Sequence, residues 1–202
     1  MQMLYRHVAM ICAAGLLPCI ASAQESLGQI AAPGEVAIEQ IGTKNIAEVN
    51  SDSDGSLVVE QQGSEQAAYV RLSGAANSGD VTQSGNGNLA EVMIAGSVNA
   101  FSLSQTTVAA GLTGNKAVLE QLGIGNIAFQ TQIGRGNSMM LRQTGDDNFA
   151  DILQDGDSNA MELNQYGDKN TAELKQLGDR AAPIIITQNG DMGAVSVTQY
   201  GE

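Results

Sequence analysis

The sequence is poor in the residues from which active sites are usually built. It contains no tryptophan, three phenylalanines, one histidine and two cysteines, and aromatic residues make up 3% of it. His7, Cys12 and Cys19 all lie near the N-terminus, so the rest of the chain has neither a thiol nor an imidazole. This excludes Ser-His-Asp and Cys-His catalysis, disulfides, and zinc sites with His or Cys ligands. We predict no catalytic, metal-binding or cofactor-binding residue, no cofactor and no enzyme activity.

The three residues just discussed lie in a segment with the features of a secretory signal peptide, residues 1–23. Arg6 precedes the apolar stretch VAMICAAGLLPCI, and Ala21-Ser22-Ala23 forms an A-x-A cleavage site before Gln24. The apolar stretch is too short to span a membrane comfortably. The alternative is a lipid anchor, because Leu16-Leu17-Pro18-Cys19 resembles a lipobox.

Positive charge is also scarce. Removing Arg6 from the nine basic residues leaves eight against 22 acidic ones, so the net charge after cleavage is −14. A basic footprint for nucleic acid is therefore absent, and we predict no nucleic-acid partner. We expect the negative charge to keep secreted monomers soluble and to delay their self-association.

What the sequence does contain is a repeat with a period of eleven residues, uninterrupted from residue 115 to residue 176. Each repeat begins with Asn, has Gln six residues later, and has Gly two residues after the Gln. The Asn positions are Asn115, Asn126, Asn137, Asn148, Asn159 and Asn170, and the Gln positions are Gln121, Gln132, Gln143, Gln154, Gln165 and Gln176. The glycines are Gly123, Gly134, Gly145, Gly156, Gly167 and Gly178. A fixed period of this kind predicts a stacked repeat architecture.

The spacing can be converted into a fold. Between Asn and Gln the apolar residues alternate, as in Ala117 and Leu119, which is the pattern of a strand. The four residues that follow are rich in Gly, Asp and Asn, which suit a tight turn, so we predict that the six glycines named above are turn glycines. Two repeats then make one 22-residue β-arch coil. We predict an all-β, two-sheet β-solenoid with a cross-β-like stack of parallel strands, and leave its handedness undetermined.

The inward positions of this solenoid include the Asn and Gln side chains, whose burial would be costly for isolated amides. In a stack, each amide can bond to its copy in the coils above and below, about 4.8 Å away. We therefore predict that the six Asn and six Gln residues form amide ladders and make up a polymerisation core. The alternative interpretation is that these residues only solubilise loops.

The same residues resemble the curlin repeat, Ser-x5-Gln-x-Gly-x2-Asn-x-Ala-x3-Gln, of the bacterial curli fibre subunits. The segment 137–154 matches it at Gln143, Gly145, Asn148, Ala150 and Gln154, and the segments 115–132 and 159–176 match it in the same way. The departure is Asn instead of Ser at the first position of each segment, and Asn keeps the laddering chemistry.

The resemblance implies a functional amyloid, namely a secreted structural subunit of an extracellular fibre at the bacterial cell surface that serves adhesion and biofilm matrix. Its implied partners are copies of itself, a companion curli subunit, the outer-membrane curli secretion channel and periplasmic chaperones. Either the major subunit or the minor, nucleating subunit fits the resemblance. The regular repeats after residue 115 and the acidic, regular last repeat favour the major subunit.

The remaining parts of the chain extend or interrupt the pattern. We expect residues 24–35 to be flexible, and the resemblance implies that the secretion channel recognises them. Residues 36–202 form one repeat solenoid of 15 candidate strands. Within it, the step from Gln40 to Gln61 is one residue short, and the segment TTVAAGLTG adds about five residues. Leu72 and Ile94 replace Gln, and an extra residue accompanies Pro183.

Charged residues at a spacing of 22 suggest contacts between neighbouring coils. Opposite charges coincide for Glu120 with Arg142, Arg135 with Asp157, and Asp147 with Lys169. Like charges coincide for Asp146 with Asp168 and for Asp151 with Glu173, and we take Asp146 and Asp168 as candidate gatekeepers that slow assembly. The alternative is a solvated surface with random pairing.

Other functions fit the sequence less well. A secreted carbohydrate-active β-helix would need paired carboxylates beside aromatic platforms, and the acidic residues are instead dispersed. Calcium β-rolls have a nine-residue period, and ice-binding solenoids have flat threonine rows. No polar cap is recognisable at either end of the repeats. Since repeat arrays normally need caps to stay soluble, an uncapped array favours end-to-end polymerisation.

Overall fold

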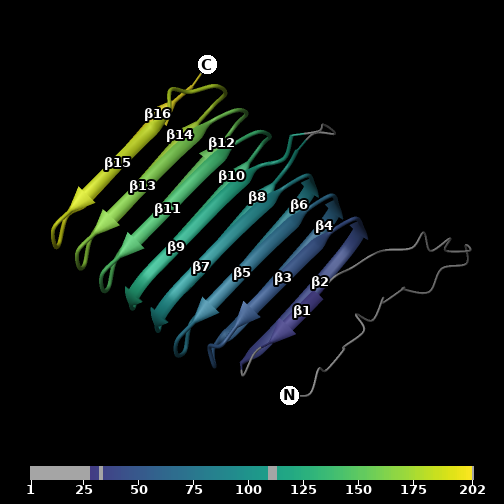
Figure 1. Cartoon of the computed structure of the whole chain (residues 1–202). Helices are drawn as coiled ribbons and strands as arrows, with labels where there is room; N and C mark the ends of the chain where they lie inside the picture. The colour runs from purple at the N-terminus through teal and green to yellow at the C-terminus, as the bar shows by residue number, and fades with distance from the viewer. Residues whose placement is uncertain (1–27, 32–33, 109–112, 202) are drawn as a thin grey trace, which may run out of the picture.

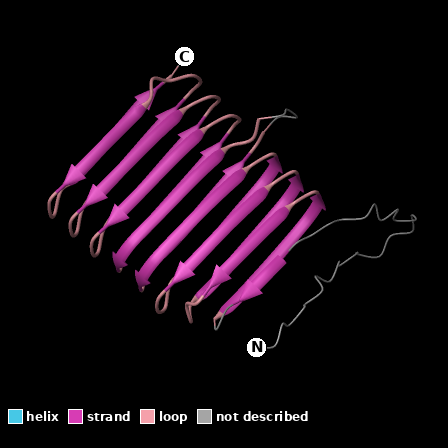
Figure 2. Cartoon of the chain, viewed as in Figure 1, coloured by secondary structure: helices cyan, strands magenta, loops and turns pink. Residues whose placement is uncertain are grey.

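The computed structural model describes residues 28–31, 34–108 and 113–201. Over these residues the chain contains strands and turns but no helix, as Figure 2 shows. The signal peptide prediction for residues 1–23 lies outside the described residues, as do residues 24–27.

Sixteen strands alternate between two eight-stranded sheets that lie face to face (Figure 1). The odd-numbered sheet contains β1 (Gly28–Ala31), β3 (Ile46–Ser51), β5 (Ala67–Ser73), β7 (Leu89–Ser97), β9 (Lys116–Ile124), β11 (Ser138–Thr144), β13 (Ala160–Tyr166) and β15 (Ile184–Asn189). The even-numbered sheet contains β2 (Glu35–Thr43), β4 (Ser56–Ser64), β6 (Ser78–Asn86), β8 (Ala100–Thr106), β10 (Ile127–Ile133), β12 (Phe149–Asp155), β14 (Thr171–Leu177) and β16 (Ala194–Tyr200).

Each strand pairs in parallel with the strand two places along the chain, so consecutive coils lie directly over one another. Gln132 is paired with Gln154, and Gln143 with Gln165, which is the predicted offset of 22 residues. The prediction of an all-β, two-sheet solenoid of stacked coils is confirmed.

The irregular steps in the sequence are absorbed in the turns, so the strands stay in register. Ser51 pairs with Leu72, an offset of 21, and Ile133 pairs with Thr106, an offset of 27 that places the five extra residues between β8 and β9. Gln165 pairs with Gln188, an offset of 23, which is one residue more than the regular step. Register is preserved because a shift of one residue in a strand would turn its whole apolar face outward.

The N-terminal part differs from the prediction. The 15 strands predicted for residues 36–202 are present as β2 to β16, with β2 beginning at Glu35, but Gly28–Ala31 forms a further strand, β1, inside the segment that we expected to be flexible. β1 pairs with β3 through backbone groups, with Ile30 opposite Val49. Adding a strand to an open sheet edge needs only backbone hydrogen bonds. The repeat motif therefore could not reveal it.

The core is a thin layer between the sheets in which every second strand residue points inward. Aliphatic residues such as Leu103, Leu141, Ile152 and Leu163 occupy its middle and are completely buried. Most of the buried Asn and Gln residues flank this aliphatic layer at the turns and at the ends of the strands. The exception inside the core is Gln130, which is buried in the middle of β10 between Leu103 and Ile152. Apart from Gln130, polar amides and apolar side chains therefore lie in separate columns that run along the stack.

Candidate functional site

A continuous column of eight glutamines runs along the even-numbered sheet. In each of its seven contacts, Nε2 of one glutamine donates to Oε1 of the glutamine in the next coil, over 2.6–3.1 Å. The column consists of Gln40, Gln61, Gln83, Gln105, Gln132, Gln154, Gln176 and Gln199. Because every donor points toward the C-terminal end, the column has a direction.

The odd-numbered sheet has a shorter column. Gln121 donates to Gln143, Gln143 to Gln165 and Gln165 to Gln188, each over 2.9 Å. Toward the N-terminus, Ile94 and Leu72 occupy the equivalent positions, as the pairing of Ile94 with Gln121 shows. Ile94 has no amide to donate, and Oε1 of Gln121 is accordingly buried without a hydrogen-bond partner. The predicted interruption of the ladder at Leu72 and Ile94 is therefore seen in the structure.

The glutamines also join the two sheets. Nε2 of Gln132 on β10 donates to the carbonyl oxygen of Lys116 on β9 over 3.1 Å, and Gln143 on β11 donates to Ile127 on β10 over 3.1 Å. Each such amide thus uses one N–H along the stack and the other across the turn. This leaves few of its polar atoms unsatisfied in a buried position.

The asparagines behave differently from the prediction. We expected every asparagine to bond to its own copies, but their main partners are backbone groups of the next coil. Oδ1 of Asn115 accepts the N–H of Asn137 over 3.1 Å, and its Nδ2 donates to the carbonyl oxygen of Gly134 over 2.9 Å. Asn side chains bond to one another at one edge only, as in Asn148 to Asn126 over 3.0 Å. The reason is that the shorter Asn sits in the turn, where backbone groups are nearest.

We call this pair of backbone contacts the asparagine clamp. It recurs from Asn126 to the turn that begins at Gly145, and from Asn137, Asn148, Asn159 and Asn170 to the turns that follow. The clamp does not need an asparagine in the coil that it holds. Asn159 accepts the N–H of Ala181, and Asn170 that of Gly193, both within 3.0 Å.

Gln66 shows what the clamp requires. It occupies an asparagine position and is completely buried, yet neither Nε2 nor Oε1 of its side chain has a hydrogen-bond partner. The longer side chain of Gln66 therefore does not make the backbone contacts that Asn115 makes at an equivalent position. A single methylene therefore separates a satisfied amide from an unsatisfied one.

The predicted turn glycines form two close-packed columns at the edges of the sheets. Gly123, Gly134, Gly145, Gly156, Gly167 and Gly178 have φ between +93° and +130°, which L residues with side chains rarely adopt. A Cβ on Gly145 would lie 2.3 Å from the carbonyl oxygen of Gly167 in the next coil. Glycine is thus required here both by the backbone conformation and by the closeness of the coils.

Two of the three predicted ion pairs form between neighbouring coils. Arg142 lies 2.7 Å from Glu120, and Arg135 lies 2.7 Å from Asp157. In the part of the chain that the structure describes, Asp147 and Lys169 form no salt bridge. Near the N-terminal end, Lys44 and Glu65 are 2.8 Å apart, and their hydrogen bond together with the charge of Lys44 lowers the pKa of Glu65. These pairs are partly or largely exposed, so each contributes little to stability.

The candidate gatekeepers make contacts that the sequence did not suggest. Oδ1 of Asp168 accepts the N–H of Asp146 over 2.8 Å, and Oδ1 of Asp146 accepts the N–H of Ile124 over 2.9 Å. Asp157 and Asp191 accept turn N–H groups in the same way. The expectation that the Asp146 and Asp168 pair simply opposes stacking is therefore incomplete, because these hydrogen bonds offset the repulsion.

Both ends of the stack leave strands with one open edge. Within the described residues, β1 and β2 at one end, and β15 and β16 at the other, each pair with a single neighbour in their sheet. Core side chains are only partly buried there, namely Val36 and Ile38 at the N-terminal end and Ile186, Val195 and Val197 at the C-terminal end. An open edge beside an incompletely buried core is a template for a further strand.

The C-terminal end continues the pattern without its next coil. Gln199 accepts from Gln176 over 3.1 Å, and its own Nε2 donates to no group among the described residues. A Cβ on Gly167 would meet the carbonyl oxygen of Gly190 at 2.4 Å, whereas a Cβ on Gly190 would meet nothing within 4 Å. Among the described residues, the last coil therefore lacks the neighbour that Gly167 and Gln176 have in the coils before it.

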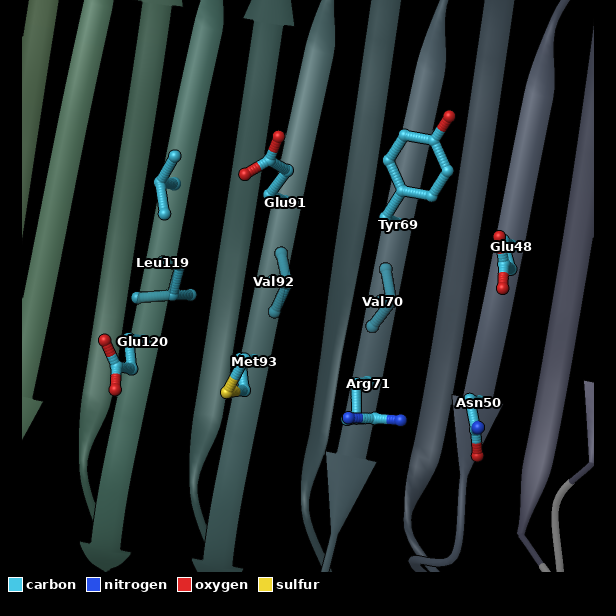
Figure 3. A pocket seen from close by; sticks show the side chains of 11 residues that line it. Glu48, Asn50, Tyr69, Val70, Arg71, Glu91, Val92, Met93, Leu119 and Glu120 are labelled. Atoms are coloured by element: carbon cyan, nitrogen blue, oxygen red, sulfur yellow. The ribbon is translucent and has the colours of Figure 1, made fainter.

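A shallow trough of about 340 Å³ crosses β3, β5, β7 and β9 on the outer face of the odd-numbered sheet (Figure 3). Tyr69 is the aromatic residue among its lining side chains, and the carboxylates of Glu48, Glu91 and Glu120 also line it. It lies outside the amide columns, so we assign no part of the candidate site to it.

Among the described residues, no three acidic, His or Cys side chains gather into a metal site. Nor is any described helix long and apolar enough to cross a membrane.

Comparison with protein families identifies two segments of the chain. A family model for the curlin associated repeat matches residues 74–106 and residues 145–178. The first segment contains β6, β7 and β8, and the second contains β12, β13 and β14, so each begins at a turn glycine and spans three strands. No curated protein and no solved structure matched the chain.

Proposed function

We propose that this chain, which carries curlin associated repeats over residues 74–106 and 145–178, is the structural subunit of an extracellular amyloid fibre that polymerises end to end. The observation that carries the proposal is the open C-terminal coil. Its strand edges, its partly exposed core and the outward Nε2 of Gln199 all continue the internal pattern. The first coil of a second copy would supply the missing layer.

The direction of the glutamine column makes such a fibre polar. Every internal contact has its donor on the N-terminal side and its acceptor on the C-terminal side, as in Gln132 to Gln154. A copy added at the C-terminal end would accept the hydrogen bond of Gln199. We propose that the twelve Asn and Gln residues of the regular repeats act as the polymerisation core, because the same contacts hold coil to coil within one chain.

We further propose that the chain is the major subunit, secreted through the periplasm and the outer-membrane curli channel with the help of periplasmic chaperones. Its roles would then be adhesion and biofilm matrix, with a companion subunit that nucleates growth at the cell surface. The regular glutamine and asparagine contacts after residue 115 support the major role. The minor role is the alternative, and it is recognised by seeding of a second subunit at a low molar ratio.

The gatekeeper role of Asp146 and Asp168 stays a prediction. Their carboxylates accept turn N–H groups, so they stabilise a formed coil. They would slow assembly only through the repulsion that incoming chains experience before those hydrogen bonds form.

The direct test is whether residues 24–202 form thioflavin-positive fibres with a reflection near 4.7 Å. The variant Gln132→Ala/Gln154→Ala/Gln176→Ala removes three consecutive rungs and leaves neighbouring amides unsatisfied, so we expect much slower growth. The matched control, Thr131→Ala/Asp155→Ala/Lys175→Ala, changes three outward residues of the same strands. Unchanged fibre growth in the glutamine variant would overturn the proposed core.

A single substitution at the C-terminal end of the glutamine column tests fibre elongation separately from folding of the monomer. Gln199→Ala removes one internal hydrogen bond, from Gln176, together with the donor that faces the next copy. We expect the monomer to stay folded by circular dichroism while seeded elongation slows severalfold. Equal elongation rates for Gln199→Ala and the unmodified chain would count against end-to-end continuation of the column.

A further inference from the structure

We propose that fibres of this chain associate laterally in pairs, through one strip on the outer face of the even-numbered sheet. This inference rests on the proposed fibre function. The strip lies on β8 and β10, which are neighbours in the middle of that sheet (Figure 1). We call it the uncharged strip and define it by the outward residues of the two strands, Ala100, Ser102, Ser104, Thr106, Ile127, Phe129, Thr131 and Ile133.

The strip carries exposed apolar surface. Phe129 is 42% exposed and Ile127 is 38% exposed, although both belong to a strand in the centre of the sheet. Phe149 on β12 extends the apolar surface, because its ring lies edge-on to Phe129 with centroids 5.9 Å apart. Contiguous exposed apolar surface rimmed by polar residues is a common feature of interaction sites.

The strip also lacks charged residues, unlike the strands on either side of it. Neither β8 nor β10 contains a charged residue, whereas their neighbours β6 and β12 present Asp80 and Asp151 on the same row as Ser102 and Phe129. On the odd-numbered sheet, charged residues appear on every strand from β3 to β13. In a chain with a net charge of −13, two copies repel each other least where this strip faces its equivalent.

The shape of the strip favours a second copy as its occupant. β10 forms a ridge with Ile127 and Phe129, while β8 beside it offers the small residues Ala100 and Ser102, paired with them in register. When two such faces meet about a two-fold axis, each ridge lies over the other's small residues. A surface that complements itself in this way is characteristic of isologous contacts.

The size of the strip explains why it would act in fibres and not in monomers. Two strands of seven residues cover roughly 10 Å by 23 Å, far below the roughly 800 Å² per partner of a stable dimer. A fibre presents the strip once per subunit, about every 38 Å for eight coils. Repeated weak contacts then add up by multivalency. Since only one of the two sheets carries the strip, association should stop at pairs of fibres.

The test compares two substitutions that add the same charge to opposite faces. Phe129→Glu places a carboxylate in the strip, between Ser102 and Asp151. The matched control is Met140→Glu on the odd-numbered sheet, because Met140 is 39% exposed and lies between Val118 and Glu162. Phe129→Ser is a second variant that removes the ridge without adding charge. The readouts are fibre width by electron microscopy and seeded elongation by thioflavin fluorescence.

We expect paired fibres from the unmodified chain and from Met140→Glu. Phe129→Glu and Phe129→Ser should give single fibres of about half the width. The elongation rates of both Phe129 variants should stay within twofold of the rate of Met140→Glu. Single fibres from the unmodified chain, or pairing that survives both Phe129 substitutions, would overturn the inference. Single unmodified fibres that bind neutral lipid vesicles through Phe129 would assign the strip to a membrane instead. If the unmodified chain forms no fibres at all, the proposed function itself fails.

Discussion

A single methylene group separates glutamine from asparagine, and in this chain it decides which groups the amide reaches. Glutamine, from the strand, reaches the glutamine of the next coil, as in Gln143 to Gln165. Asparagine, from the turn, reaches the backbone of the next turn, as in Asn137 to Gly156. The two residue types are therefore not interchangeable, although both are buried amides. Their positions could be predicted from the repeat, but the partners of asparagine could not, because a backbone group leaves no signal in the sequence.

Gln66 provides a test of this distinction. Gln66→Asn should restore a clamp to the next turn, and because it satisfies a buried amide we expect about 1–3 kcal/mol of added stability. In a domain of this size, that corresponds to a rise in Tm of roughly 2–12 °C. The reverse exchange, Asn137→Gln, should lower Tm by a similar amount. Thermal unfolding followed by circular dichroism measures both, and shifts of the same sign would contradict the clamp.

The glycines of the turns differ in backbone conformation and in their closeness to the next coil, so their replacement by alanine should differ in cost. Gly136 has φ +65°, and a Cβ there would come no nearer than 3.7 Å to Ser158. Gly136→Ala should therefore cost only the roughly 1–2 kcal/mol of a left-handed residue. Gly145→Ala should cost more than about 3 kcal/mol, because φ there is +117° and because its Cβ would also collide with the Gly167 carbonyl oxygen. Urea unfolding of the two variants measures both losses, and equal losses would contradict the collision between neighbouring coils.

At the scale of the strands, the two sheets differ in the side chains that stack at the glutamine position. The even-numbered sheet has glutamine in every coil at one position, while the odd-numbered sheet changes to Ile94 and Leu72. Burying an aliphatic side chain stabilises by about 1.5–3 kcal/mol, against about 1 kcal/mol for a hydrogen bond. The gain from aliphatic burial is comparable to the cost of the unsatisfied Oε1 of Gln121 beside Ile94, so the change alters stability little. We infer that the glutamine column chiefly specifies register, which apolar packing alone specifies less strictly.

A large side chain on one strand can also occupy the space beside a glycine on the neighbouring strand. Phe101 on β8 is buried beside Gly79 on β6, and a Cβ on Gly79 would lie 2.4 Å from the Phe101 ring. Gly79→Ala should cost about 1–3 kcal/mol by overpacking. In a Phe101→Leu background the same change should cost less, giving a coupling energy of about 1 kcal/mol in a double-mutant cycle. Additive effects from denaturant unfolding would show that the two strands do not share this space.

The strand pattern could be predicted well where the period is strict and less well where contacts are local. The offsets of 21, 27 and 23 residues follow from counting between motifs such as Gln40 and Gln61. The pairing of Gly79 with Phe101 could not be predicted, because a strand glycine more often marks a bulge. Strand β1 was missed for the reason given above, since it contributes backbone hydrogen bonds and no motif.

At the scale of the whole molecule, net charge and chain ends act against each other. The open coils favour addition of further copies, whereas a formal charge of −13 repels them. The exposed ion pairs, such as Arg135 with Asp157, contribute at most about 1 kcal/mol each, so their screening by salt is a minor effect. Repulsion between approaching copies therefore dominates the response to ionic strength.

We accordingly expect salt to accelerate fibre formation. The screening length falls from about 30 Å at 0.01 M to about 8 Å at 0.15 M, which is shorter than the distance over which two copies approach. The lag time of residues 24–202 at neutral pH should shorten severalfold over this range, measured by thioflavin fluorescence. Sodium chloride and choline chloride should act alike, since screening does not depend on the cation. A lag time that stays constant or lengthens with salt would show that repulsion does not limit assembly, and that the barrier lies in folding of the single chain.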